Sequence, residues 1–467
     1  MEHREQSGTP DMLEATLNQV GEMVSRSYLA ELEDCKVQPA GREERQLKLD
    51  SAGRFYRLDR LVLNKREQFL DRLTTILNVA VAVQGSVVTL FYSSGQENAF
   101  YMGVISKRFR ADGYRDKRES IFQAVIGAAR GNLPGSCFTP VGAEEFTGVL
   151  EEMKDGAVCS VSGIPDVKTD AEHREYLQGL ERLGDAMRGQ RYAVLFIADP
   201  VSQEELMLVR QGYEELFTQL SPFASSQISL QQSQTQTRGE SYSESLSKSI
   251  SKSLSLSQSI SESSSHSQGT STGYGVHLGV GLPFGLGAGA NFQRGNNDAH
   301  TQTRQSGNSK MHTEGEVDAQ GQQHGWNQAE GTSSGVSCQF TQENQGIRSL
   351  LDRIQEHLRR LELCESVGAV QAAAYVLAPD RNTALTVAGN YSALLRGGHS
   401  GLETAYLNVW SKSPMASLTG DGQDSVREIL GFLSHGMHPR FYREETGRSV
   451  NATTLLNSRE AAQQLLF

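Results

Sequence analysis

Hydrophobic and polar residues along this chain follow two different periods. Most of the sequence has the spacing of ordinary helices and buried strands, but from Ser241 to Gln268 every odd-numbered residue is serine, fourteen in succession. A flexible linker does not need this parity. A β-strand does, because its side chains point alternately to opposite faces. The pattern therefore separates an ordinary body from a long insertion.

Before residue 150 the pattern predicts two amphipathic helices, over 11–34 and 64–80, and two strands, over 86–94 and 99–106. From residue 156 onward, strands and helices alternate. We expect strands at 157–165, 191–201 and 369–380, and helices at 170–189, 202–221, 346–364 and 381–397. Ser202 and Glu205 have the spacing of a capping box at the start of one of these helices. This order predicts an α/β (α+β) body that a long β-hairpin insertion interrupts.

The same pattern divides the chain into four ranges. They are a helical and α/β region (1–150), the first half of an α/β domain (151–225), a Ser/Gly-rich hairpin insertion (226–340), and the second half with a C-terminal segment (341–467). The insertion carries an apolar tip at 274–292. The insertion thus lies between two helices of the body rather than at its end.

Both arms of the insertion keep the parity. All 18 odd positions of 241–275 are serine or glycine, and 14 of the 19 odd positions of 301–338 are small. An apex near Phe284 pairs odd with odd positions, so both arms present their small residues on one face. A flexible Ser/Gly linker is the alternative. The small face of the first arm is represented by Ser241, Ser243, Ser245, Ser247, Ser249, Ser251, Ser253 and Ser255.

A hairpin of this length requires partners. The first arm would extend on the order of 110 Å at about 3.3 Å per residue, and a lone two-stranded ribbon is not stable in water. Pairing with copies of itself in a closed barrel removes the open edges. We therefore expect a homo-oligomeric ring in which each subunit contributes one hairpin to a tube, similar only in architecture to the stems of oligomeric β-barrel pore formers. The small face lines the lumen or packs on a second layer.

The tip has a different composition from the arms. Its even positions from 276 to 292 are all apolar, while most of its odd positions are glycine. Each leg approaches the 9–11 residues of a membrane-crossing strand, so the tip contacts either lipid or a protein partner. The residues of this tip face are Val276, Leu278, Val280, Leu282, Phe284, Leu286 and Phe292.

Composition narrows the classes of function. The net charge of −11 argues against a general nucleic-acid binder, although the basic stretch at 106–118 leaves a solvated loop or a contact with DNA or anionic lipid open. The five scattered cysteines form no CxxC pair and favour reduced thiols. We expect no Sec-type signal and no transmembrane helix, and hence a cytoplasmic protein, with membrane association at the tip left open.

Motifs for catalysis are weak. The dipeptide Gly-Lys does not occur, so there is no P-loop. The GxSxG matches at 269–273 and 331–335 and the loose GxGxxA match at 285–290 lie within the insertion, away from the strand–turn–helix context that such motifs need. The two histidines of "HGMH" at 435–438 have no third ligand nearby in the sequence and are typical of a loop. We expect no enzyme activity, no metal and no cofactor.

Three segments carry a resemblance to a known family. "RYAVLFIADPV" with a helix ending "LSPF", then "AAAYVLAPDRNTALTVAGNYSALLRGGHSGLE", and finally "VNATTLLNSREAAQQL" resemble the N-terminal region of HerA/FtsK-like, conjugation-type DNA-translocating ATPases. The resemblance covers about 156–223 and 345–465 and does not include the motor. It implies an accessory scaffold domain of a translocase system, in conjugation-like transfer or phage defence, with a separate ATPase as partner. The residue pattern itself favours the homo-oligomeric tube.

Overall fold

The computed structural model describes the body of the chain and the base of the insertion. The described residues are 20–22, 24–41, 44, 47–62, 69–107, 114–166, 168–169, 175–176, 180–229, 339–343, 345–397, 400–412, 425–443 and 448–465. The remainder of the insertion, 230–338, lies outside them.

A nine-stranded sheet forms the centre of the body. Its order is β13-β6-β12-β9-β3-β4-β2-β5, with β16 also paired to β12. The strands are β2 (Gly53–Arg60), β3 (Ser86–Ser94), β4 (Asn98–Ile105), β5 (Cys137–Val141), β6 (Ala157–Ser162), β9 (Arg191–Pro200), β12 (Ala369–Ala378), β13 (Tyr406–Ser411) and β16 (Thr454–Asn457). The ranges 1–150, 151–225 and 341–467 all contribute strands, so they share one sheet.

Every pairing in this sheet is antiparallel. The structure is therefore of the α+β class, and the α/β reading of the alternating strands and helices is wrong. A single crossover helix returns the chain to a parallel strand. Between β9 and β12, however, the chain runs out along one helix and back along another, so β12 returns antiparallel beside β9. The described strands form open sheets and no closed barrel.

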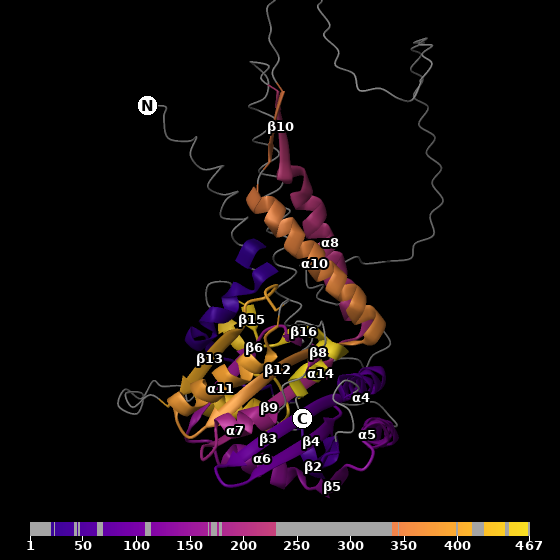
Figure 1. Ribbon diagram of the computed structural model, residues 1–467, viewed down its shortest axis with the longest axis vertical. Coiled ribbons are helices and arrows are strands. Elements are labelled where there is room, and N and C mark those ends of the chain that lie inside the picture. The colour runs from indigo at the N-terminus through magenta and orange to yellow at the C-terminus, as the bar shows by residue number, and fades with distance from the viewer. Residues whose placement is uncertain are drawn as a thin grey trace, which may run out of the picture.

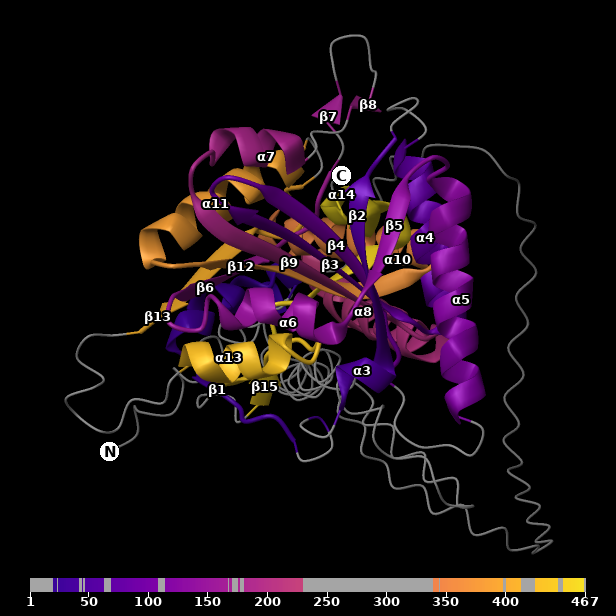
Figure 2. The same ribbon diagram turned by 90° about the horizontal axis from the view of Figure 1, so that it is seen from below.

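Helices cover both faces of the sheet, as Figure 2 shows for α7 and α11 on one side and α6 and α13 on the other. One face packs on α4 (Phe69–Val83), α5 (Tyr114–Asn132), α7 (Leu180–Ala186), α11 (Arg381–Leu395) and α14 (Ser458–Leu465), and the other on η1 (Ser27–Asp34), α3 (Leu49–Ala52), α6 (Ala143–Glu151) and α13 (Ser425–Leu433). Alternate residues of β12 enter the two cores, and all ten of its residues are buried. Burial on both faces explains the unbroken apolar run of this strand.

Three small ladders complete the described structure. One joins β1 (Lys36–Val37), β14 (Phe441–Arg443) and β15 (Arg448–Val450). Another joins β7 (Lys168–Thr169) to β8 (Glu175–Tyr176), so the helix predicted over 170–189 is wrong in its first part and α7 begins only at Leu180. The third ladder, β10 (Ser225–Ser229) with β11 (Gln339–Glu343), forms the base of the insertion.

The helix predicted over 11–34 is also wrong as a single element. Residues 20–22 and 24–25 are helical, but Arg26 has a left-handed conformation, with φ of 55°, and a 3₁₀ helix follows it. A left-handed residue interrupts the hydrogen-bond ladder of an α-helix. Hydrophobic spacing continues across this break and so does not reveal it.

Candidate functional site

Two long helices lift the insertion away from the body. β9 leads into α8 (Gln203–Ala224) and β10 (Ser225–Ser229), and the chain returns through β11 (Gln339–Glu343) and α10 (Gln345–Val367) into β12. We call α8 and α10 the stalk. Figure 1 shows the stalk projecting from the body, with β10 at its far end. The strands, helices and terminal ladder thus form one continuous hairpin rooted in the central sheet.

The two arms of this hairpin have nearly equal lengths between the central sheet and the terminal ladder. At the root, Pro200 pairs with Val370, and at the far end Ser225 pairs with Glu343 and Ser229 with Gln339. The stalk helices have 22 and 23 residues, so neither arm gains much length on the other. Each described pair of β10 with β11 joins residues of the same parity, as the predicted hairpin with an apex near Phe284 requires. The apex itself lies outside the described residues.

The body end of the stalk begins as the sequence predicts. Glu205 N–H donates to Ser202 Oγ at 3.2 Å, and Ser202 N–H donates to Glu205 Oε2 at 2.9 Å. This confirms the capping box. The helix continues to Ala224, and Pro222 lies in its last turn, where the chain changes from helix to strand.

The stalk has two apolar cores, one near the body and one near the hairpin. The lower core comprises Val201, Leu206, Val209, Leu361, Cys364 and Ala369. The upper core comprises Val20, Val24, Leu216, Leu220, Ile347, Leu351 and Ile354. Because the upper core contains two valines from the N-terminal segment, α8 and α10 alone do not complete it.

Charged pairs connect the stalk helices to each other and to the body. Arg210 of α8 donates to both oxygens of Glu365 on α10, at 3.0 and 2.9 Å. Arg360 of α10 donates to both oxygens of Glu460 on α14, at 3.0 and 2.8 Å, and to Leu455 O. Paired arginine–carboxylate bonds fix direction as well as distance. The lower half of the stalk is therefore held at a defined angle to the body.

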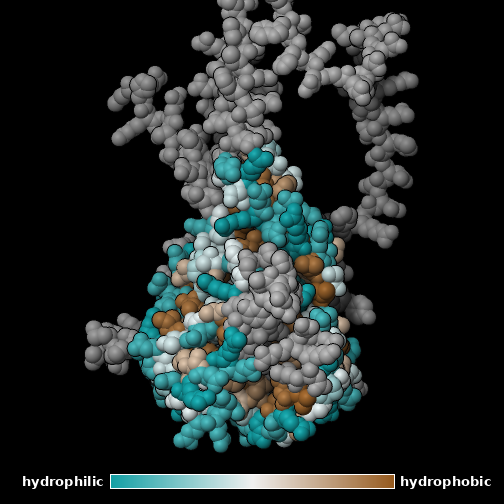
Figure 3. Space-filling model, viewed as in Figure 1, coloured by the Kyte–Doolittle hydropathy of each residue, from teal (hydrophilic) through white to brown (hydrophobic). Residues whose placement is uncertain are grey.

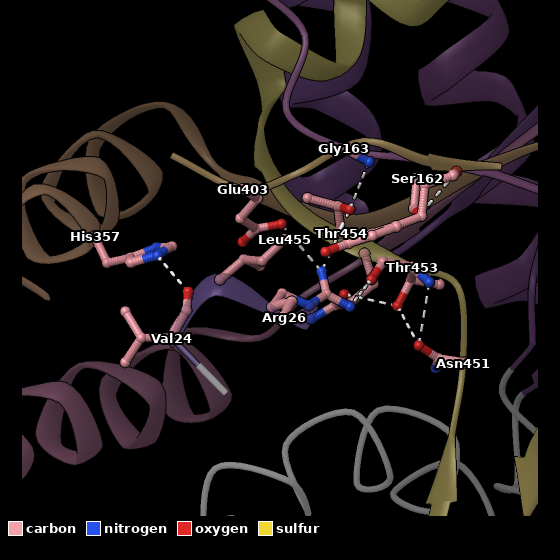
Figure 4. Close-up of polar contacts among 12 residues, drawn as sticks. Val24, Arg26, Ser162, Gly163, His357, Glu403, Asn451, Thr453, Thr454 and Leu455 are labelled. Carbon is pink, nitrogen blue, oxygen red and sulfur yellow. Dashed lines mark hydrogen bonds and ion pairs between the residues drawn. The ribbon is translucent and has the colours of Figure 1, made fainter. Parts of the chain in front are cut away.

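Residues 20–22 and 24–26, which we call the strap, cross from the stalk to the body. Val20 and Val24 are buried in the upper core, and His357 of α10 lies 3.1 Å from Val24 O through Nε2 (Figure 4). The His357 ring stacks on Tyr213 of α8, with ring centres 5.0 Å apart. Burial lowers the pKa of His357 to about 4, so the ring is neutral near pH 7.

Arg26 ends the strap at the body. Its guanidinium pairs with Glu403 at 3.3 Å and donates to Thr454 Oγ1 and Thr453 O (Figure 4). The side chains of Arg26 and Glu403 are only 12% and 6% exposed. Burial alone lowers the pKa of Arg26, but Tyr28 and Glu403 beside it outweigh burial and raise it. Thr454 Oγ1 also accepts a bond from Gly163 N–H, so the pair is tied to β16 and to the end of β6.

A second polar group, which we call the root cluster, lies where β9 meets the stalk. Asp199 pairs with Lys107 and lies 3.7 Å from His438 Nε2, and His438 Nδ1 lies 2.8 Å from Tyr375 Oη. Burial raises the pKa of Asp199, but Lys107 and His438 outweigh it and lower that pKa. Burial also lowers the pKa of His438 to about 4.

The sequence did not single out any member of the strap contacts or the root cluster as functional. Lys107 belongs to the basic stretch that we assigned to a solvated loop or a surface contact, but its side chain is 4% exposed and pairs with Asp199. The two histidines of "HGMH" have different partners, since His435 Nδ1 contacts Gly431 O and His438 contacts Tyr375. Within the described part of the chain, no three His, Cys, Asp or Glu side chains are placed to hold a metal ion.

The serine face and the apolar tip lie outside the described residues, as do both GxSxG matches and the GxGxxA match. Four of the cysteines, Cys35, Cys137, Cys159 and Cys364, are described, and none of these four forms a disulfide. None of the described helices combines the length and the hydropathy needed to cross a membrane. The face of the molecule in Figure 3 is mostly hydrophilic where it is described, with a few hydrophobic patches, one of them near the base of the stalk.

No protein-family model matches this chain, and searches of curated proteins and of solved structures give no significant match. The three segments that resemble translocase N-terminal regions contain β9, β12 and β16. These strands are neighbours in the sheet. The resemblance stays a prediction.

Proposed function

We propose that this protein is a non-enzymatic subunit of a homo-oligomeric ring, in which the hairpins of neighbouring subunits close into a long β-barrel tube. The observation that supports it most is the register of β10 with β11. Five residue pairs at the base join residues of like parity, which is the condition that the serine pattern sets for the arms. The backbone pairing at the base is thus compatible with the side-chain parity of the arms, because both place odd-numbered residues opposite odd-numbered residues.

The geometry of the stalk also supports a tube. The hairpin continues the central sheet through two helices that Arg210 joins to each other, and the pair of Arg360 with Glu460 holds these helices at one angle to the body. Identical subunits in a ring would therefore present their hairpins in parallel. Among the described strands β10 pairs only with β11, so each keeps an edge for a neighbouring copy.

Electron microscopy of the purified protein tests the proposal. We expect rings that carry a projecting tube, and a variant with 230–338 replaced by a short Gly/Ser turn should lose the tube. The matched control deletes the tip alone, 274–292, and should shorten the tube without removing it. A monomeric full-length chain in light scattering, or rings whose outline is the same with and without the insertion, would refute the tube.

The residues of the tip bear on whether the end of the tube contacts lipid or protein. Apolar even positions with glycine opposite suit either lipid or a protein that caps the tube. A single hairpin would enter hydrocarbon with unpaired backbone groups, so membrane contact requires the assembled ring. Liposome binding by rings, and not by the tip-deleted control, supports the membrane role.

An accessory role beside a DNA-translocating ATPase is the second proposal. It rests on the resemblance and on the adjacency of β9, β12 and β16, which carry the resembling segments. In this role the ring would serve as a scaffold for a separate motor. Images of compact rings without a tube, together with stimulation of such an ATPase, would favour this role over the first.

A further inference from the structure

The strap joins the upper core of the stalk to the body. Two buried valines and the contact between His357 and Val24 O hold it to the stalk, whereas Arg26 makes several polar contacts with the body. The stalk end is therefore the attachment that includes a histidine, His357. Its release would leave the apolar residues Leu216 and Ile347 of the upper core without their cover.

His357 contacts the strap at its stalk end. The carbonyl of Val24 can only accept a hydrogen bond, so Nε2 of His357 carries the proton and the ring donates. A second proton on Nδ1 would place a cation in a buried site. The groups that face it are Arg360 on α10, Arg26 and Val24 on the strap, Tyr213 on α8, and Glu403 before β13.

Together, the charges of these groups disfavour the protonated form of His357. Arg360 and Arg26 repel it, and each already has its own carboxylate partner, Glu460 and Glu403. Glu403 attracts it but is occupied by Arg26. Opening of the strap would let water reach His357 and would relieve the burial that disfavours its charge.

From this geometry we propose that the strap is a clasp that fixes the stalk to the body, and that protonation of His357 opens it. Mild acid then uncovers the upper core of the stalk while the body stays folded. The clasp operates within one chain, so the proposal stands whether or not the subunits form a tube.

The expected change in the opening equilibrium follows from the pKa of His357 in the closed and in the open state. With a pKa of about 4 in the closed state and 6.5 in the open one, lowering the pH from 7.5 to 5 favours opening by about 30-fold. The direction follows from linkage: a histidine whose pKa is lower in the closed state binds its proton preferentially in the open state.

Thiol labelling of the full-length chain measures this opening. In Val24→Cys the new thiol is covered by the clasp, and in Glu22→Cys it is exposed. The ratio of their alkylation rates by iodoacetamide, read peptide by peptide by mass spectrometry, cancels the pH dependence of the reagent. We expect this ratio to rise about 30-fold between pH 7.5 and 5.

Two further variants identify which histidine causes the rise in the labelling ratio. His357→Gln keeps a donor for Val24 O but does not titrate, and should abolish the rise, whereas His438→Asn in the root cluster should leave it. A ratio that stays within twofold across this range, or rises equally in His357→Gln, would overturn the proposal. If the rise disappears only in His438→Asn, the response belongs to the root cluster and the clasp assignment is wrong. Circular dichroism of each variant at pH 7.5 checks that the body is folded.

Discussion

The root cluster predicts how acid destabilises the body. The His438 side chain is 7% exposed, and burial lowers its pKa from 6.5 to about 4. The unfolded chain therefore binds this proton more readily than the folded chain. The contribution of this site to the free energy of unfolding is fully present above pH 6.5 and decreases as the pH drops toward 4.

The magnitude follows from the same two values. At pH 5 the folded protein should lose about 2 kcal/mol through His438 relative to pH 7.5. Urea unfolding at a series of pH values between 7.5 and 5 measures the total loss, to which His357 also contributes, and comparison with a His438 variant isolates the part that is due to His438. Carboxylates contribute little in this window, because most titrate below it.

Substitution of His438 distinguishes its contribution to the pH dependence of stability from the contributions of other titrating groups. In His438→Asn the amide can still contact Tyr375 Oη but does not titrate, so the variant should be about 2 kcal/mol less sensitive to this pH change than the wild type. His435→Asn on the same loop is the matched control and should behave as wild type. Lys107→Met removes a positive charge that lowers the pKa of His438, and should move the transition to higher pH. An unchanged pH dependence in His438→Asn would refute the reasoning.

The insertion gives three more predictions. Cysteines in place of Lys252 and Glu316 should cross-link within one subunit, because the register of β10 and β11 continued upward makes these positions opposite; bridging to 315 or 317 would mean a slipped register. Trp in place of Ser251 and Ser255 should block assembly or narrow the tube, and normal assembly with an unchanged lumen in electron micrographs would contradict the assignment of the small face. Asp in place of Leu278 and Leu286 should abolish liposome binding or leakage while rings remain intact in electron micrographs; if wild-type rings do not bind liposomes of any composition, the tip contacts protein instead.

Local patterns predicted the central elements well. The strand predicted over 86–94 is β3, and 191–201 and 369–380 contain β9 and β12. These strands are buried on both faces, so their apolar runs are long and clear. The capping box at Ser202 could also be predicted from the sequence, because a cap depends only on residues three apart.

Long-range features were not predictable in the same way. Alternating helices and strands suggested an α/β domain, but the direction of β12 depends on α8 and α10 packing as a pair, and no short window records that. The pairing of Lys107 with Asp199 joins residues 92 positions apart. The break at Arg26 depends on Glu403 and Thr453, which lie far along the chain. A buried lysine in a basic stretch looks the same as an exposed one until its partner is known.

The edges of the sheets suggest why assembly would be directed to the hairpin. β13 is an end strand of the central sheet, yet Val409 N–H donates to Glu33 Oε1 and Val409 O accepts from Arg381, at 2.7 Å each. Glu33 and Arg381 also pair with each other, at 3.1 Å. Side chains thus occupy backbone groups that an added strand would use, which is a recognised way to protect an edge. Among the described strands, β10 and β11 pair only with each other, so strand addition between copies is expected at the hairpin rather than at β13.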